Sequence, residues 1–279
     1  MSIRNLSLRI KNDNINVYSS NAAFFLFLAI VPFLMLLTIF LRYTTITETM
    51  LLSIFSDIPS EAISNFFNAI ITDIFHKNTA TTAVISISAF TALFSASRGM
   101  IAVMRGLNSV YHVEEDRNYV QKRAIAVFYT LMLAVILIFV LLLVVFGNVV
   151  GGIIIKNAKP LAPLIDFIYN IRMVIVTVIL FFFFTIVYKA VPNHKSSLRD
   201  QIPGALFTSL GWGLFSFFFS IYIKYFSNYS NIYGSLTTVI IMMLWLYIMV
   251  YIMLLGGMLN SLYNPEAETD TLPKAPLLD

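Results

Sequence analysis

The chain has 279 residues, of which 59% are hydrophobic and only 11% are charged, and its mean hydropathy is +0.84. Soluble domains carry about 25% charged residues, so this composition excludes a water-soluble globular protein. The net charge of +4 arises from Lys and Arg scattered among short loops, which is not the basic stripe that binds nucleic acid. The absence of Cys excludes disulfides and thiol chemistry.

Six apolar stretches of helix length organise the sequence. About 20 apolar residues in a helix match the roughly 30 Å hydrocarbon core of a bilayer, and a helix satisfies its own backbone hydrogen bonds there. The predicted fold class is therefore all-α: a polytopic integral membrane protein with a bundle of six transmembrane helices and an amphipathic extracytoplasmic helix. The predicted spans cover residues 22–41, 81–104, 124–147, 171–190, 202–223 and 234–259.

The first span reads as a signal anchor, because its apolar run is longer than that of a cleaved signal peptide. Eleven Lys and Arg fall in loops on one side of the predicted spans and six on the other. Since cytoplasmic loops retain positive charge, we expect a multi-pass protein of the cytoplasmic (inner) membrane with both termini in the cytoplasm. The expected division is a cytoplasmic segment over 1–21, a transmembrane domain over 22–260 and a cytoplasmic tail over 261–279.

Two outer loops carry local signals. Apolar residues recur at helical spacing over 60–76, which predicts an amphipathic helix too polar to span. Such a helix is either a packing lid or a gate over a cavity. In the second loop, Pro160 and Pro163 are expected to interrupt the third and fourth helices.

Small residues predict where the helices pack. In lipid, helices associate through close approach of small side chains, and the fifth span carries Ala205, Ser209, Gly213 and Ser216 at spacings of three and four. We expect this stripe at the centre of the bundle. Asn260, near the end of the sixth span, is expected to make hydrogen bonds between helices.

Arg172 and Lys189 lie at the ends of their span and are counted with the loops, which leaves Arg98 as the Lys or Arg in the interior of a predicted span. An ionisable group at bilayer depth is costly, so it is either a structural residue that snorkels or pairs, or a functional one. The functional hypothesis places Arg98 in a cavity that attracts anions. The candidate substrate-binding residues of this hypothetical cavity are Arg98, Arg105, Asn108, Tyr233 and Ser235.

The order of several landmarks resembles the YihY/BrkB family of bacterial inner-membrane proteins, whose members have been labelled virulence factors and, historically, ribonuclease BN. The landmarks are AAFFLFLAIVPFLMLL around Pro32, SRGMIAVMRGLNSVYHVEEDR, VYKAVPN, and YGSLTTVIIMMLWLYIMVYIMLLGGMLN with Tyr233, Gly234, Ser235, Trp245, Gly256 and Asn260. We expect Pro32, Gly234, Trp245 and Gly256 to serve packing. Where this family commonly has an acidic residue near the end of its last helix, this chain has Met258, so a carboxylate-based coupling role cannot be carried over.

The sequence gives no support for catalysis. His76, His112 and His194 lie singly in different loops, and the chain has no phosphate-binding loop, nucleophile elbow or HExxH motif. The acidic run 114–116 lies beside Arg117 and is expected to be a solvated hairpin. We therefore expect no enzyme, no catalytic residue, no cofactor and no metal.

Two function classes compete. The first is transport of an amphiphilic or anionic solute, such as a lipid or envelope precursor. The second is a non-transporting scaffold or regulator of envelope integrity or virulence. Membrane lipids and a lipid-like or anionic substrate are the expected partners, nucleic acid is not, and self-association to a homo-oligomer stays open.

Overall fold

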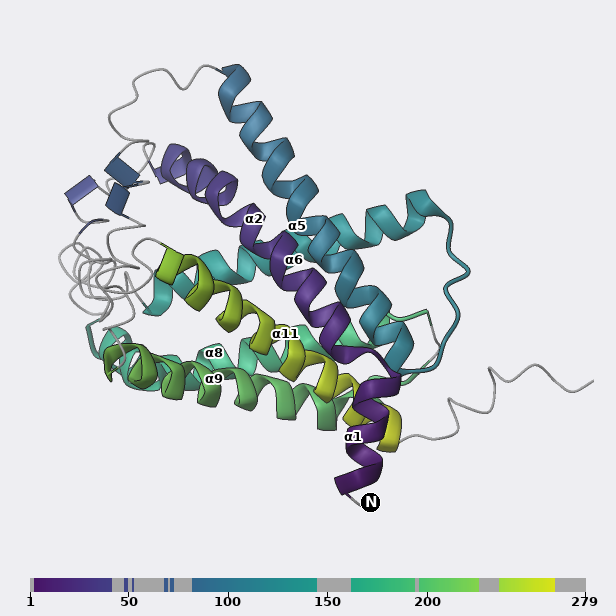
Figure 1. Cartoon of the computed structure of the whole chain (residues 1–279). Coiled ribbons are helices and arrows are strands. Elements are labelled where there is room, and N and C mark those ends of the chain that lie inside the picture. The colour runs from purple at the N-terminus through teal and green to yellow at the C-terminus, as the bar shows by residue number, and fades with distance from the viewer. Residues whose placement is uncertain are drawn as a thin grey trace, which may run out of the picture.

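The computed structural model describes residues 3–41, 48–49, 52, 68–69, 71–72, 82–144, 162–193, 196–225 and 236–263. Every regular element within these ranges is helical, which confirms the predicted all-α fold (Figure 1). A short helix and a 3-10 turn accompany long helices. In chain order these elements are α1 (Ile3–Asn12), α2 (Ile15–Leu41), α5 (Thr82–Val110), α6 (Tyr119–Val144), α8 (Ala162–Ala190), η2 (Arg199–Gln201), α9 (Ile202–Tyr225) and α11 (Leu236–Tyr263).

Several of these helices are suited to a bilayer. Among the described residues, four segments are long and apolar enough to cross a membrane: Tyr119–Val140, Asn170–Ala190, Arg199–Ile223 and Leu236–Tyr263. α2 adds the shorter apolar segment Ile15–Ile30. α5 is long as well but carries Arg98 and Arg105. The predicted polytopic helical bundle is thus confirmed.

Some predicted features fall outside the described residues. Nearly all of the expected amphipathic helix over 60–76 does so, as do Tyr233, Gly234 and Ser235. Pro32 lies within α2, but its side chain is outside the described part. Pro163 lies in the first turn of α8, a position where the missing N–H of proline costs no intrahelical hydrogen bond.

The long helices form a ring in chain order. Each packs against the next one along the sequence, and α11 closes the ring by packing against α2 while also contacting α5. The α1–α2 corner, the loop 111–118, residues 191–193 and the last turn of α11 meet at one end of the bundle (Figure 1). Side-chain contacts link them there, including a hydrogen bond from Arg9 of α1 to Ser261 of α11. We call this the polar end.

The side chains that the protein buries are concentrated toward the polar end. Leu107 of α5, Phe184 and Tyr188 of α8, and Leu254 of α11 are fully or almost fully buried in one apolar cluster. By contrast, no described side chain is buried over 131–140 of α6, 210–218 of α9 or 239–248 of α11. The described helices are therefore tightly sealed to one another at this end and less enclosed further along.

Glycines allow α9 and α11 to touch. A Cβ added at Gly204 would collide with the carbonyl oxygen of Gly256, and one added at Gly256 would collide with the Thr208 hydroxyl. The expected stripe on α9 is only partly inward. Ala205 and Ser209 are buried, but Gly213 is exposed, and a Cβ there would meet nothing within 4 Å. The close approach falls at Gly204 instead, because its backbone lies directly against Gly256 of α11.

Candidate functional site

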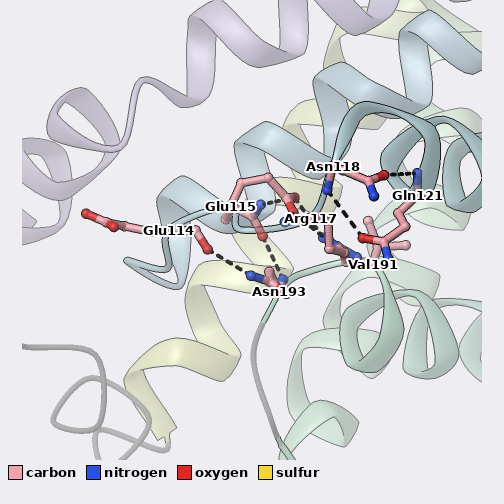
Figure 2. A network of polar contacts seen from close by, with 8 residues as sticks. Glu114, Glu115, Arg117, Asn118, Gln121, Val191 and Asn193 are labelled. Atoms are coloured by element: carbon pink, nitrogen blue, oxygen red, sulfur yellow. Dashed lines mark hydrogen bonds and ion pairs between the residues drawn. The ribbon is translucent and has the colours of Figure 1, made fainter.

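A hydrogen-bonded clamp joins two loops at the polar end, and Figure 2 shows most of it. The side-chain amide of Asn108, near the end of α5, donates to Glu115 Oε2 at 2.8 Å. Its oxygen accepts from the backbone N–H of Asn193 at 2.9 Å. Asn193 in turn donates through Nδ2 to the carbonyl oxygen of Glu114 at 3.0 Å. The buried amide of Asn108 thus connects α5 to the loops on either side of the α6–α8 pair.

Arg117 completes this loop clamp, which we define as Asn108, Glu115, Arg117, Asn193 and the carbonyl of Val191. The Arg117 guanidinium donates to both Glu115 oxygens, at 2.7 and 2.8 Å, and to the Val191 carbonyl at 2.8 Å. Partial burial alone would raise the pKa of Glu115. The hydrogen bonds from Arg117 and Asn108, together with the Arg117 charge, outweigh burial and hold that pKa below its usual value.

Helix-end signals in the sequence shape the 111–118 loop. α5 ends with His112 in the left-handed region (φ 54°), and the N–H groups of His112 and Val113 bond back to Ser109 and Asn108, which is a Schellman motif. α6 begins with a capping box, in which Asn118 and Gln121 each accept from the backbone N–H of the other. These two caps fix where the loop leaves one helix and enters the next.

A second polar cluster is fully buried between three helices. Asn260 of α11 donates through Nδ2 to Gln201 Oε1 at 3.0 Å and to the Tyr111 hydroxyl at 3.3 Å. Tyr111 donates to the same Gln201 oxygen at 2.7 Å. The remaining oxygen of Asn260 accepts from the backbone N–H of Gly204 at 2.6 Å. Both amide protons and the oxygen of Asn260 therefore have partners, which confirms the interhelical hydrogen bonding expected for this residue.

Tyr188 links α8 to the next two helices. Its hydroxyl donates to the Met253 carbonyl at 2.7 Å and lies 2.6 Å from the Thr208 hydroxyl. Since a phenol has one proton, Thr208 donates to Tyr188. Trp212 on α9 makes a similar bond from its indole N–H to the Met249 carbonyl. Backbone carbonyls of α11 thus accept hydrogen bonds from one side chain of α8 and one of α9.

The α1–α2 corner is tied to the end of α5. Asn14 adopts a left-handed conformation at this corner (φ 53°). The preceding Asp13 is buried, and its Oδ1 lies 3.1 Å from Nε2 of His112. Ser109 donates its hydroxyl to the Asp13 carbonyl at 2.9 Å. These contacts hold the N-terminal helix against the polar end.

The arginine of the predicted cavity lies on an outer face. Arg98 is exposed, and its guanidinium carbon lies 4.7 Å from the centre of the Phe94 ring and 5.5 Å from that of Phe25. Arg105 is exposed two turns further along α5, whereas Asn108 is buried in the loop clamp. Arg98, Arg105 and Asn108 are the cavity candidates that the structure describes, and it does not bring their side chains together in one cavity.

Several functional positions were not apparent from sequence. The acidic run 114–116 was expected to be solvated, but Glu115 is half-buried in the clamp with Arg117. Tyr111 and Tyr188 lie in landmark segments of the family resemblance but were assigned no role there, and Gln201 was not singled out. Trp245, expected to pack, is half-buried, as is Ser216. Across the described ranges, no group of three or more His, Asp and Glu could hold a metal ion.

Comparison with known proteins agrees with the fold. The family described as Virulence factor BrkB matches residues 6–277 of the chain. The ribonuclease-like protein YfkH of Bacillus subtilis (strain 168) is 32% identical over 205 residues, which is 72% of this chain and 73% of that protein. No solved structure matches. The chain belongs to the BrkB virulence-factor family.

Proposed function

We propose that this BrkB-family membrane protein moves an amphiphilic or anionic solute, such as a lipid or envelope precursor, across the bacterial cytoplasmic membrane. In this proposal the polar end faces the cytoplasm, both termini lie on that side, and no residue is catalytic. Neither a cofactor nor a metal is required.

The observation that carries the proposal is the seal at the polar end of the bundle. Side chains are buried where α5, α8, α9 and α11 meet at the polar end, and the described middle stretches of α6, α9 and α11 bury none. A protein that exposes a solute path first to one side and then to the other needs such a closed end in one of its states.

The loop clamp is held by hydrogen bonds, which allows the polar end to open. The two loops are joined by hydrogen bonds: Arg117 donates to the Val191 carbonyl, and Asn193 donates to Asn108 and to the Glu114 carbonyl. A neutral bond of this kind contributes only about 0.5–1.5 kcal/mol net and one from a charged group about 1.5–3 kcal/mol, because water replaces it when it breaks. The clamp can therefore release at smaller cost than an apolar interface of the same extent.

The proposal is tested with purified protein in liposomes that contain an anionic phospholipid labelled on one acyl chain. We expect the protein to speed transbilayer movement of this probe relative to protein-free liposomes. Asn193→Ala, which loosens the clamp, should change that rate.

A folded wild-type protein that moves no probe would contradict the transport proposal. That outcome would favour the alternative class, a scaffold or regulator of the envelope. The ribonuclease-like name of the Bacillus relative raises a third class. Among the described residues, His112 and Asp13 are the pair that most resembles an acid–base pair of a nuclease. If the protein released labelled RNA fragments and His112→Ala did not, the transport proposal would be replaced by a nuclease.

A further inference from the structure

We propose that Arg98 and Arg123 together hold the phosphate of an anionic membrane lipid on the membrane-facing side of α5 and α6. The ligand class is an anionic glycerophospholipid, recognised by its phosphate and covered along its acyl chains by exposed aromatic side chains. This inference stands apart from the proposed function, because the lipid is bound there whether or not it is the solute that moves.

Two cations are fixed around one aromatic ring. The guanidinium carbon of Arg98 lies 4.7 Å from the centre of the Phe94 ring, and that of Arg123 lies 4.3 Å from the same centre. The two guanidinium carbons are therefore less than 10 Å apart. Arg123 also donates to the Phe94 carbonyl at 3.3 Å. Cation–π contacts and this hydrogen bond orient both side chains before any ligand arrives.

No described carboxylate neutralises this pair of arginines. The ion pairs found in the described ranges involve Arg9, His112 and Arg117 instead. Two like charges held close together repel each other, and an arginine at the edge of a bilayer carries a desolvation cost as well. Both costs fall when an anion binds between them. An unneutralised arginine pair on a membrane protein thus indicates an anionic ligand.

The position of the pair selects a lipid phosphate. Arg123 lies in the second turn of α6, so it is close to where the candidate span Tyr119–Val140 begins. Lipid phosphates lie at this depth, and basic pockets between helices bind them. The two rings that contact Arg98 have exposed aromatic neighbours: Phe90, 69% exposed, stacks on Phe94, and Phe24, 47% exposed, packs edge-on against Phe25. The acyl chains of a lipid can cover these exposed aromatic side chains, whereas a free anion would leave them uncovered.

Guanidinium chemistry favours phosphate over a single carboxylate. Each arginine offers a planar fork that donates two parallel hydrogen bonds to neighbouring oxygens. Two guanidinium groups beside one ring offer more donors than a carboxylate has oxygens, so together they suit a group with several oxygens. Phe25 of α2 gives Arg98 a second aromatic contact, with the guanidinium carbon 5.5 Å from the centre of its ring.

The test is lipid retention by the full-length protein purified in detergent with equal amounts of phosphatidylglycerol and phosphatidylcholine. We expect the wild type to retain phosphatidylglycerol preferentially, as measured by native mass spectrometry. The Arg98→Gln/Arg123→Gln variant should lose at least about tenfold of this preference, since one arginine near an anionic lipid contributes about fivefold. Phe94→Leu keeps both charges and should lose part of the preference.

Arg105→Gln is the matched control, because it removes one exposed arginine from the same helix away from Phe94. It should retain the wild-type preference. Equal loss in this control would show attraction to net charge and overturn the site, as would an unchanged preference in the double variant. Displacement of the lipid by millimolar inorganic phosphate would overturn the lipid assignment in favour of a free anion.

If the double variant does not fold, the Phe94→Leu result decides, with an unchanged preference contradicting the site. Retention requires no flux, so its failure is distinct from failure of transport.

Discussion

The side chain of Asn260 reaches from the last turns of α11 to the first turn of α9, where its oxygen accepts a 2.6 Å hydrogen bond from the backbone N–H of Gly204. The first N–H groups of a helix have no partner within that helix. Asn260 therefore acts as an N-terminal cap supplied by a neighbouring helix. Pro203, the preceding residue, has no N–H that needs one.

Asn260→Leu should destabilise the protein by about 2 kcal/mol or more, because it leaves Gly204, Gln201 and Tyr111 without their shared partner. The measurement is thermal unfolding of the purified protein in detergent. Asn170→Leu, at an exposed position of α8, is the control and should unfold close to the wild-type temperature. Equal stability of both variants would refute the capping role.

Gly204→Ala and Gly213→Ala should have opposite effects on stability. At Gly204 the new Cβ would collide with the Gly256 carbonyl, so α9 and α11 must separate, at a cost of about 1–3 kcal/mol. At Gly213 it enters open space, and alanine favours a helix by about 1 kcal/mol over glycine. Thermal unfolding of the two variants compares these directly. A larger loss at Gly213 would show that a partner outside this chain packs there.

Tyr188→Phe should lower stability by about 1–2 kcal/mol, because the Thr208 hydroxyl loses its acceptor and the Met253 carbonyl loses a donor. The ring itself stays in place, so packing is unchanged. Tyr263→Phe is the control at a side chain that is 71% exposed. Denaturant or thermal midpoints would give the difference, and a Tyr188 variant as stable as the Tyr263 variant would contradict the assignment.

Acidification should weaken the loop clamp through Glu115. The native pKa of Glu115 is lowered from its ordinary value of 4.5, so the native state binds this proton less readily than the unfolded state. Its contribution is therefore complete above pH 4.5 and is lost as pH falls through the lowered native pKa. Unfolding midpoints measured from neutral pH downward should show Glu115→Gln less stable near neutrality, with the gap to wild type closing below pH 4.5. Parallel curves would mean that the carboxylate contributes nothing.

Apolar runs in the sequence located the helices well but not their ends. The predicted span over 81–104 is α5, Thr82–Val110, and the one over 171–190 is α8, Ala162–Ala190. The helices continue into polar sequence, because each ends where a capping motif ends it and not where the apolar residues stop. The Schellman turn at His112 and the capping box at Asn118 are such signals.

The candidate site was predicted less well, for a physical reason. Asn260 was recognisable as a polar group in an apolar setting, which must find a partner. Which partner it finds depends on residues such as Gln201 and Tyr111, far away in sequence, and a single chain does not reveal such pairs. The direction in which Arg98 points was also undetermined, because a long side chain on α5 can turn toward the bundle or toward lipid.

The central claim is that the loop clamp must open for a solute to cross, and cross-linking it is the most direct measurement. Asn193 Nδ2 lies 3.0 Å from the Glu114 carbonyl, and the chain contains no Cys, so Glu114→Cys/Asn193→Cys provides the only two thiols. A short bis-maleimide should then stop movement of the labelled anionic lipid in liposomes, while each single-Cys variant moves the lipid at the same rate with and without the reagent. Movement at the same rate before and after complete cross-linking would contradict the account.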